Sequence, residues 1–313
     1  MYQYIYEESI KRAKHKIWIL SDLQQKDPER ARECLDISMA DYESMGAPAD
    51  MIWYLGDSIE GTNREHLSQM CQMQEQAFEK TGLPLCYVMG NHELDYSRAK
   101  EHEQEPVFLP FYEMVKKHEG WHTTPAYTAP YFKISLGDFK VYFFSDHIAE
   151  DKSWMSLWGN IQGKEYYPHG EIMGQIREEM EQENSPIITA AHYSFCGGNR
   201  ASAQLSTLLP LPHQVKIHFY GHAHIGDYAW AKENAYRRIS CVDWHDIPQI
   251  NVSSFEHIRG TFCRSVFLHI YEDNSFGIFF RNHNARKFSE VYFPAKEKQP
   301  RGGNFDGFKG QLI

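Results

Sequence analysis

The sequence lacks the long apolar run that a membrane span requires. No stretch of its 313 residues approaches about 18 consecutive apolar residues, the usual minimum for a transmembrane helix. Its first residues, MYQYIYEESIKRAKHK, are polar and charged, and they contain no apolar core of signal-peptide length. These two absences predict a cytoplasmic protein that does not enter a membrane.

An excess of positive charge is also missing. The chain has 32 lysine and arginine residues against 42 aspartate and glutamate residues, and its formal net charge is −10 at pH 7. Nucleic acids and anionic membranes bind basic surfaces, so this balance argues against both as general partners. It is compatible with a small phosphorylated substrate, because bound metal ions supply positive charge locally whatever the charge of the whole protein. The sequence leaves the question of protein partners open.

The cysteines show no C-x-x-C spacing. There are six, at Cys34, Cys71, Cys86, Cys196, Cys241 and Cys263. A disulfide framework is not expected in a chain of this size without a secretion signal. We therefore expect the cysteines to be reduced, mostly buried and structural.

Short apolar runs alternate with helical patterns in the first half of the chain. The runs KIWILS (16–21), MIWYLG (51–56) and LPLCYVMG (83–90) are typical of short buried strands. Between them, residues 27–46 and 63–80 have the spacing of helices. This βαβαβ order predicts a largely parallel sheet covered by helices.

The second half is richer in strand patterns. Residues 131–145 predict a hairpin that turns at Gly137 and Asp138, and residues 264–281 predict another. The remaining patterns are a helix at 170–182, buried strands at 186–192 and 216–222, and strand-like runs at 236–242, 249–255 and 289–293. No internal repeat is present, and the end of the chain is rich in Lys, Gln, Gly and Pro. We therefore predict a single domain over 1–293 and a loosely packed tail over 294–313.

Five of the predicted strands end in residues that can bind a metal ion. In chain order these residues are Asp22 and Gln24, Asp57, Asn91 followed by His92, His192, and the pair His222 and His224. Any one of them alone is explained as a helix cap or a packed core residue. In an open α/β sheet, however, ligands bind beyond the carboxyl ends of the strands, so we expect the set to converge on one crevice. Two divalent cations would compensate these buried polar groups, and the mixture of imidazole, carboxylate and amide suits Mn, Fe, Zn or Mg.

In this order the motifs resemble those of the calcineurin-like metallophosphoesterase superfamily. That pattern is D-x-H, G-D-x-x-D/E, G-N-H-D/E, a single H and then G-H-x-H. The present chain has D-L-Q, G-D-S-I-E, G-N-H-E, A-A-H and G-H-A-H within residues 16–225. The resemblance implies an α/β fold in which two mixed β-sheets pack as a sandwich flanked by helices (α/β/β/α), built around a dinuclear metal centre.

The resemblance also implies a set of metal ligands. Asp57 would bridge the two divalent ions. The first ion would be bound by Asp22 and His224 with whatever occupies position 24, and the second by Asn91, His192 and His222.

Gln24 stands where the resemblance places a histidine. The amide oxygen of glutamine can coordinate a metal ion, but it is a harder and generally weaker ligand than imidazole, which favours Mn or Mg over Zn. In a second interpretation Gln24 lies behind the ligands, and water or another side chain fills the gap. His147 and His245 are candidates for that side chain, although an ordinary loop role suits each better. In a third interpretation the first site is largely empty. Manganese is the favoured metal.

The predicted ligands imply a hydrolytic reaction. Two cations about 3.5–4 Å apart clamp a transferring phosphoryl group and lower the pKa of a bridging water. The resulting hydroxide attacks phosphorus in line with the leaving oxygen, which then needs a proton, and His92 is the candidate general acid. The resemblance supports this role and gives Glu60 the task of orienting and charging His92. A Glu60 that is simply exposed in a loop is the alternative.

Several residues near the motifs are candidates for binding the substrate. Arg64 follows the second motif and could bind a phosphate oxygen bidentately, while Asn199 and Arg200 follow two glycines after the fourth motif. Tyr193 and His147 are similar candidates, and an ordinary loop role is open for all five. We predict a metal-dependent hydrolase of a small phosphate mono- or diester. The alternative is a binding protein or scaffold that keeps the fold and has lost turnover.

Overall fold

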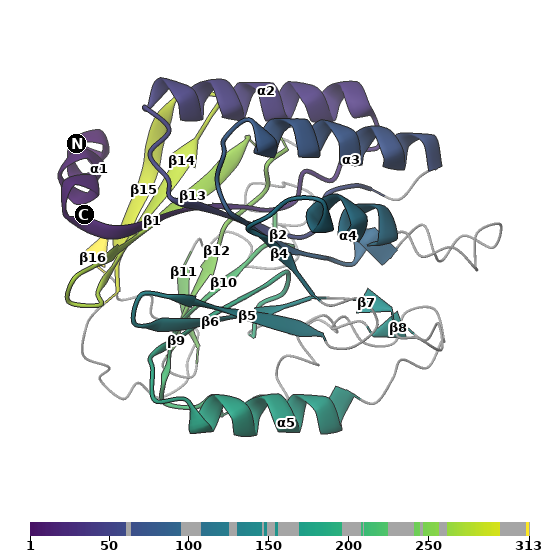
Figure 1. The fold of residues 1–313 in the computed structure, drawn as a ribbon. Coiled ribbons are helices and arrows are strands. Elements are labelled where there is room, and N and C mark those ends of the chain that lie inside the picture. The colour runs from purple at the N-terminus through teal and green to yellow at the C-terminus, as the bar shows by residue number, and fades with distance from the viewer. Residues whose placement is uncertain are drawn as a thin grey trace.

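The computed structural model describes residues 1–60, 64–94, 108–124, 130–145, 147–148, 154–155, 169–195, 208, 210–224, 241–244, 247–256, 262–294 and 311–312. Figure 1 shows four layers: α2, α3 and α4 lie over one sheet, a second sheet lies beneath it, and α5 lies below the second sheet. This arrangement confirms the predicted α/β/β/α sandwich. Within these residues, no helix is both long and apolar enough to cross a membrane.

The helices and strands have the following bounds. The helices are α1 (Tyr2–Arg12), α2 (Pro28–Ser44), α3 (Arg64–Glu79), α4 (Phe108–Lys116), α5 (His169–Gln182) and the 3-10 turn η1 (His92–Leu94). The larger sheet has the order β16 (Gln311–Leu312), β15 (Lys287–Phe293), β14 (Phe276–Asn282), β13 (Arg264–Tyr271), β1 (Ala13–Leu20), β2 (Met51–Leu55), β3 (Leu85–Val88) and β4 (Trp121–Thr123). The smaller sheet has the order β11 (Cys241–Trp244), β12 (Ile247–Asn251), β10 (Val215–Tyr220), β9 (Ile187–Ala191), β6 (Phe139–Phe144) and β5 (Tyr131–Leu136). A separate pair is formed by β7 (His147–Ile148) and β8 (Trp154–Met155).

The alternating direction of side chains along each strand places them in different layers of the core. Successive side chains of a strand point to opposite faces of the sheet. On β1, Trp18 therefore packs in the core beneath the helices, while its neighbour Ile19 packs in the core between the two sheets. On β9, Ile188 faces the core between the sheets and Ile187 faces the core that includes α5. Both sheets are apolar on two faces, which is why their strands appear as unbroken apolar runs in the sequence.

The strands that carry the first three motifs are parallel, as predicted. β1 pairs with β2, β2 with β3 and β3 with β4, all in parallel register. The other half of the larger sheet is antiparallel, because β13 joins the free edge of β1 and continues into β14 and β15. The sheet is therefore mixed, and all three motif loops leave it from the same edge.

Two helices were not anticipated from the sequence. Helix α4 carries Pro110 in its first turn, where a proline costs no helical hydrogen bond, so the residue that argues against a helix is tolerated there. Helix α1 is polar over most of its surface, and its buried side chains are Tyr6 and Ser9. The Tyr6 ring stacks on Phe288 of β15 with a centroid separation of 4.2 Å, which docks α1 on the larger sheet.

Part of the C-terminal segment pairs with the larger sheet. Gln311 and Leu312 form β16 against β15, while residues 295–310 and Ile313 lie outside the described residues. The division into one domain over 1–293 and a tail over 294–313 stays a prediction.

The cysteine prediction holds for the four cysteines whose side chains are described. Cys34, Cys71, Cys86 and Cys263 are buried, and none of these four forms a disulfide. Cys196 and the side chain of Cys241 lie outside the described part of the chain.

A buried ion pair attaches α2 to the larger sheet. Arg281 of β14 donates from Nε to Asp41 Oδ2 at 2.8 Å and from Nη2 to Asp41 Oδ1 at 2.7 Å. His283 Nδ1 lies 2.8 Å from the same Oδ2. Burial alone would raise the pKa of Asp41, but the hydrogen bonds from Arg281 and His283 outweigh it and lower the pKa to about 2. The ionised form of Asp41 therefore stabilises the fold.

Replacing Asp41 by alanine should lower the free energy of unfolding by about 3–5 kcal/mol, because the buried guanidinium of Arg281 loses its carboxylate. The folded-state pKa lies below the ordinary value of 3.8, so this contribution is present above pH ~4 and disappears as the pH falls towards ~2. Urea titrations of wild type and variant between pH 7 and 2.5 measure both effects. The matched control is Glu181→Gln, which removes a partly exposed arginine pair (Arg177 Nε to Glu181 Oε1, 3.1 Å) and should cost at most about 1 kcal/mol. If the two variants lost the same free energy of unfolding, the ion pair of Asp41 and Arg281 would not be a major stabilising contact.

Candidate metal centre

The five motif loops are joined to one another by hydrogen bonds. The amide of Asp22 donates to the carbonyl of Gly56 at 2.9 Å, and the amide of Gln24 donates to the carbonyl of Asp57 at 3.0 Å. The amide of Gly221 donates to the carbonyl of His192 at 3.2 Å. The amide of His92 donates to Asp57 Oδ1 at 2.9 Å, and the amide of His222 donates to Asp22 Oδ2 at 2.8 Å. These bonds connect all five loops and the ends of both sheets, so the predicted convergence is present.

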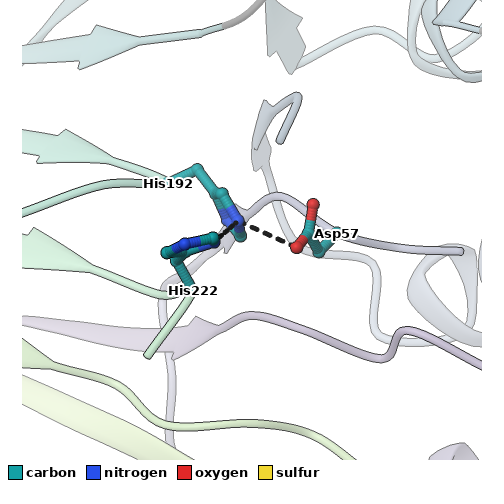
Figure 2. Close-up of side chains that lie close together, drawn as sticks. All are labelled: Asp57, His192 and His222. Carbon is teal, nitrogen blue, oxygen red and sulfur yellow. Dashed lines mark hydrogen bonds and ion pairs between the residues drawn. The ribbon is translucent and has the colours of Figure 1, made fainter. Parts of the chain in front are cut away.

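Asp57, His192 and His222 form the first of two ligand groups (Figure 2). His192 Nε2 lies 2.9 Å from Asp57 Oδ2 and 3.2 Å from His222 Nδ1. The candidate ligand atoms of this group all lie within 4.8 Å of one another, and the three residues are buried. This group corresponds to the predicted second ion, for which Asn91 is the fourth candidate.

The ring of His192 is fixed from behind. Its Nδ1 lies 2.7 Å from the carbonyl oxygen of Leu55, to which it donates, so that Nε2 faces Asp57. Burial alone would lower the pKa of His192, but the carboxylates of Asp57 and Asp22 outweigh it and raise the pKa to about 10. A cation that binds to this nitrogen must therefore displace a proton.

Asp22, Asp57 and His224 form the second ligand group. His224 Nε2 lies 2.9 Å from Asp22 Oδ1, and the other carboxylate oxygen of Asp22 accepts a hydrogen bond of 2.8 Å from the amide of His222. Asp57 belongs to both groups. A residue with this placement is the one that can bridge two ions.

Gln24 contacts His92 through its side chain and Asp57 through its backbone amide. Its Nε2 is 2.5 Å from His92 Nε2. Its Oε1 is buried and has no hydrogen-bond partner in the described part of the protein. A buried amide oxygen left in this way is costly, and a cation would compensate it. The first of the three interpretations, in which this oxygen binds a cation, stays a prediction.

His92 differs from the candidate ligands in its exposure. Its side chain is 19 % exposed, whereas that of Asp57 is 1 % exposed. The amide of His92 donates to Asp57 Oδ1 at 2.9 Å, so the backbone at the start of η1 is fixed against the candidate bridging residue. Asn91, one residue earlier, is buried. The ring of His92, whose Nε2 lies 4.0 Å from Asp57 Oδ2, is therefore more accessible than the side chain of Asp57.

The backbone at the candidate ligands is strained. Five of them have a positive φ, a conformation that costs about 1–3 kcal/mol in residues other than glycine: Asp22 (58°), Gln24 (31°), Asp57 (56°), His222 (61°) and His224 (42°). Such strain persists only where surrounding contacts hold it in place. The hydrogen bonds between the loops are those contacts.

Glycines allow the loops to approach this closely. A Cβ on Gly90 would lie 2.4 Å from Asp57 Oδ1, and a Cβ on Gly221 would lie 1.9 Å from Ser21 Oγ. Neither distance is compatible with a side chain. The glycines that precede Asn91 and His222 in the motifs are therefore required by packing around the two aspartates.

The donor atoms fit two divalent cations. Carboxylate and imidazole groups converge in two overlapping groups, and the buried amide oxygen of Gln24 has no hydrogen-bond partner in the described part of the protein. The site has no room for a side chain at Gly90 or Gly221. In this structure the imidazoles and carboxylates also compensate one another, since His192 is paired with Asp57 and His224 with Asp22. The sequence-based expectation that these groups would be unpaired without metal was too simple.

Residues 15–226 match the family model described as "Calcineurin-like phosphoesterase". The chain belongs to the calcineurin-like phosphoesterase family. No curated protein matches it significantly. Among solved structures, a dimetal phosphatase from Danio rerio is 10% identical, with 86% of this chain and 95% of that chain covered and a TM-score of 0.57.

Two further structures share the calcineurin-like fold but are longer. A purple acid phosphatase from yellow lupin (Lupinus luteus) seeds is 13% identical, with 89% of this chain and 53% of that chain covered and a TM-score of 0.52. The NAD nucleotidase of Haemophilus influenzae is 10% identical, with 91% and 52% covered and a TM-score of 0.50. The present chain spans about half the length of each. At these identities the likeness shows a common fold.

Two carboxylates of this family member were given no role by the sequence. Glu93 accepts hydrogen bonds from the amides of Asp57 (3.1 Å), Ser58 (2.6 Å) and Gly90 (2.7 Å), so it joins the second and third motif loops. Burial and the nearby carboxylate of Asp57 raise the pKa of Glu93. Glu256 follows β12 and lies against His224. The sequence offered a signal for Glu93, as the last letter of G-N-H-E, and none for Glu256.

The other predicted residues are less closely tied to the centre. The side chain of Glu60 is 26 % exposed and its Oε1 lies 3.5 Å from Lys26 Nζ, so its action on His92 stays a prediction. Tyr193 is buried, and its ring lies edge-on to His192 and His222.

The remaining substrate and substitute-ligand candidates are not described in the same detail. Arg64 begins α3 and His147 begins β7, but neither side chain is among the described ones. Asn199, Arg200 and His245 lie outside the described residues. Their roles stay predictions.

Proposed function

We propose that the protein hydrolyses a phosphate ester of a small molecule, with two divalent cations held by the two overlapping ligand groups. One observation carries this proposal: Asp57 lies in both groups and therefore sits where a bridging carboxylate is needed. Membership of the calcineurin-like phosphoesterase family supports the same reaction class. The Danio rerio protein, 95% of whose chain is covered in the comparison, is a dimetal phosphatase.

The ligands divide between the two cations as the resemblance implies. The first would be held by Asp22, Asp57, His224 and the amide oxygen of Gln24, and the second by Asp57, Asn91, His192 and His222. When bound, the cations supply positive charge for the phosphoryl oxygens and lower the pKa of a water molecule. An amide oxygen in place of imidazole favours Mn over Zn at the first position.

His92 is proposed as the general acid. Its ring is partly exposed and adjoins both Asp57 and Gln24, with 2.5 Å between Gln24 Nε2 and His92 Nε2. From there it would donate a proton to the leaving oxygen, while Glu60 would help to orient it. Arg64, Asn199 and Arg200 are proposed phosphate contacts. The cytoplasmic location also stays a prediction.

Hydrolysis of simple aryl phosphates tests the proposal. The purified protein is freed of metal, and Mn, Fe, Zn or Mg is then added to assays with aryl phosphate monoesters and diesters. We expect turnover that depends on metal and is fastest with Mn, that a chelator abolishes and that added Mn restores, together with two bound ions per chain by elemental analysis. Absence of turnover with every metal and both ester classes would favour the scaffold alternative.

A further inference from the structure

Glu256 contacts the candidate ligand His224 and also Gln25, the residue that follows Gln24. Its Oε1 lies 3.2 Å from His224 Nδ1, and its Oε2 accepts a hydrogen bond of 2.5 Å from Gln25 Nε2. The three side chains are buried, and Glu256 is 1% exposed. This carboxylate therefore contacts His224 on the side of the ring opposite to the nitrogen that faces Asp22.

The contact fixes which nitrogen of His224 can bind a cation. His224 Nε2 lies 2.9 Å from Asp22 Oδ1, inside the first-ion group. A cation that binds to Nε2 displaces the proton that this nitrogen shares with Asp22. While Nδ1 donates to the carboxylate of Glu256, the lone pair is then on Nε2, and the carboxylate makes that nitrogen a stronger donor. His192 shows the same arrangement with a neutral acceptor, since its Nδ1 donates to the carbonyl of Leu55.

The first ion has fewer candidate imidazole ligands than the second, so the orientation of His224 matters more for its affinity. His224 supplies the imidazole of the group Asp22, Asp57 and His224, while the second ion is offered imidazoles by both His192 and His222. Gln24 adds only an amide oxygen, which is a weaker ligand. The strength of the first site therefore depends on the donor quality of a single ring.

Glu256 is not placed to be a ligand itself. His224 lies between it and Asp22, and each of its carboxylate oxygens is engaged by a nitrogen, one from His224 and one from Gln25. Gln25 directly follows Gln24, so the bond from Gln25 also joins the loop after β1 to the segment after β12.

We propose that Glu256 is a positioning residue for the first metal ion: it holds His224 with its proton on Nδ1 and its lone pair on Nε2, and Gln25 holds Glu256. This inference rests on the proposed two-metal function. It assigns a role to a residue beyond residue 226, where the family match ends.

Metal titration of Glu256 variants tests the inference. Mn binding to metal-free wild type, Glu256→Gln and Glu256→Ala is followed by calorimetry, which resolves the two ions as separate steps. We expect Glu256→Ala to weaken the first site by about 10–100-fold, the usual effect of removing such a partner, and Glu256→Gln to weaken it less, because its amide oxygen can still accept from Nδ1. The second site should change little. The matched control is Glu75→Gln, which removes a carboxylate–histidine contact (Glu75 Oε1 to His118 Nε2, 2.9 Å) on α3 and should leave both affinities unchanged.

A spectroscopic measurement on wild type completes the test and does not depend on any variant folding. In the protein loaded with Zn, which is diamagnetic, nitrogen NMR of the His224 ring should show a protonated Nδ1 and a coordinated Nε2. Coordination through Nδ1, unchanged first-site affinity in both Glu256 variants, or equal weakening of both sites would each overturn the inference while leaving the proposed function in place. A wild-type protein that takes up no divalent ion would overturn both.

Discussion

Replacing Asp57 by asparagine should remove both metal ions together and abolish metal-dependent hydrolysis. Asp57 is common to the two ligand groups, and an amide has neither the charge nor the second anionic oxygen of a bridging carboxylate. The loss of affinity should exceed the roughly 100-fold that removal of a supporting residue costs. Elemental analysis after dialysis against a fixed concentration of Mn measures both occupancies, and the aryl phosphate assay measures turnover.

Asp50→Asn is the control for this experiment. Asp50 pairs with Lys16 at 3.1 Å on a partly exposed surface, and its replacement should alter neither metal content nor turnover. If the Asp57 variant kept one ion at wild-type occupancy, Asp57 would be a ligand of the other ion alone and would not bridge.

His92→Asn should slow the hydrolysis of esters with poor leaving groups by about 10²–10⁴-fold, the contribution expected of a general acid. The loss should shrink as the leaving group improves, because a stable phenolate needs no proton. Metal content should stay at the wild-type level: the ring is not a proposed ligand, and the hydrogen bond from the residue 92 amide to Asp57 survives the substitution. The measurement is the slope of the logarithm of the hydrolysis rate against the pKa of the leaving group, over a series of aryl phosphates.

His118→Asn is the matched control, since the His118 side chain is 20% exposed, close to the 19 % of His92. It should leave the slope unchanged. A His92 variant that lost the same factor with good and poor leaving groups would not have lost a general acid.

The sequence predicted the part of the site that strand ends determine. Asp57 and His192 are far apart in the chain, yet Asp57 lies two residues after β2 of the larger sheet and His192 directly follows β9 of the smaller sheet, so each could be recognised as a polar residue at the end of a buried strand. Their contact of 2.9 Å also requires the two sheets to pack face to face, which the local patterns alone do not specify. The two-sheet fold was predicted on the same motifs through the family resemblance.

Residues whose role depends on contacts across the chain were not predictable in this way. Glu256 lies in a segment with no metal-ligand spacing, and its role is defined by His224. In the sequence Asp41 looks like an ordinary polar residue of a helix. Its burial in an ion pair depends on Arg281, which is 240 residues away in the chain. A carboxylate on an amphipathic helix looks the same in a sequence whether it faces water or a buried guanidinium.

The position of β1 sets the order in which this protein can be built. One edge of β1 pairs with β2, about thirty residues later, but the other edge pairs with Arg264–Tyr271 of β13. During synthesis, which proceeds from the N-terminus, β1 therefore has no β13 to pair with until most of the chain has been made. Asp57 and Asp22 likewise cannot form their contacts until His192 and His224, respectively, have been synthesised. A chain whose synthesis stops before residue 264 thus has every candidate ligand but lacks β13, the strand that pairs with the second edge of β1.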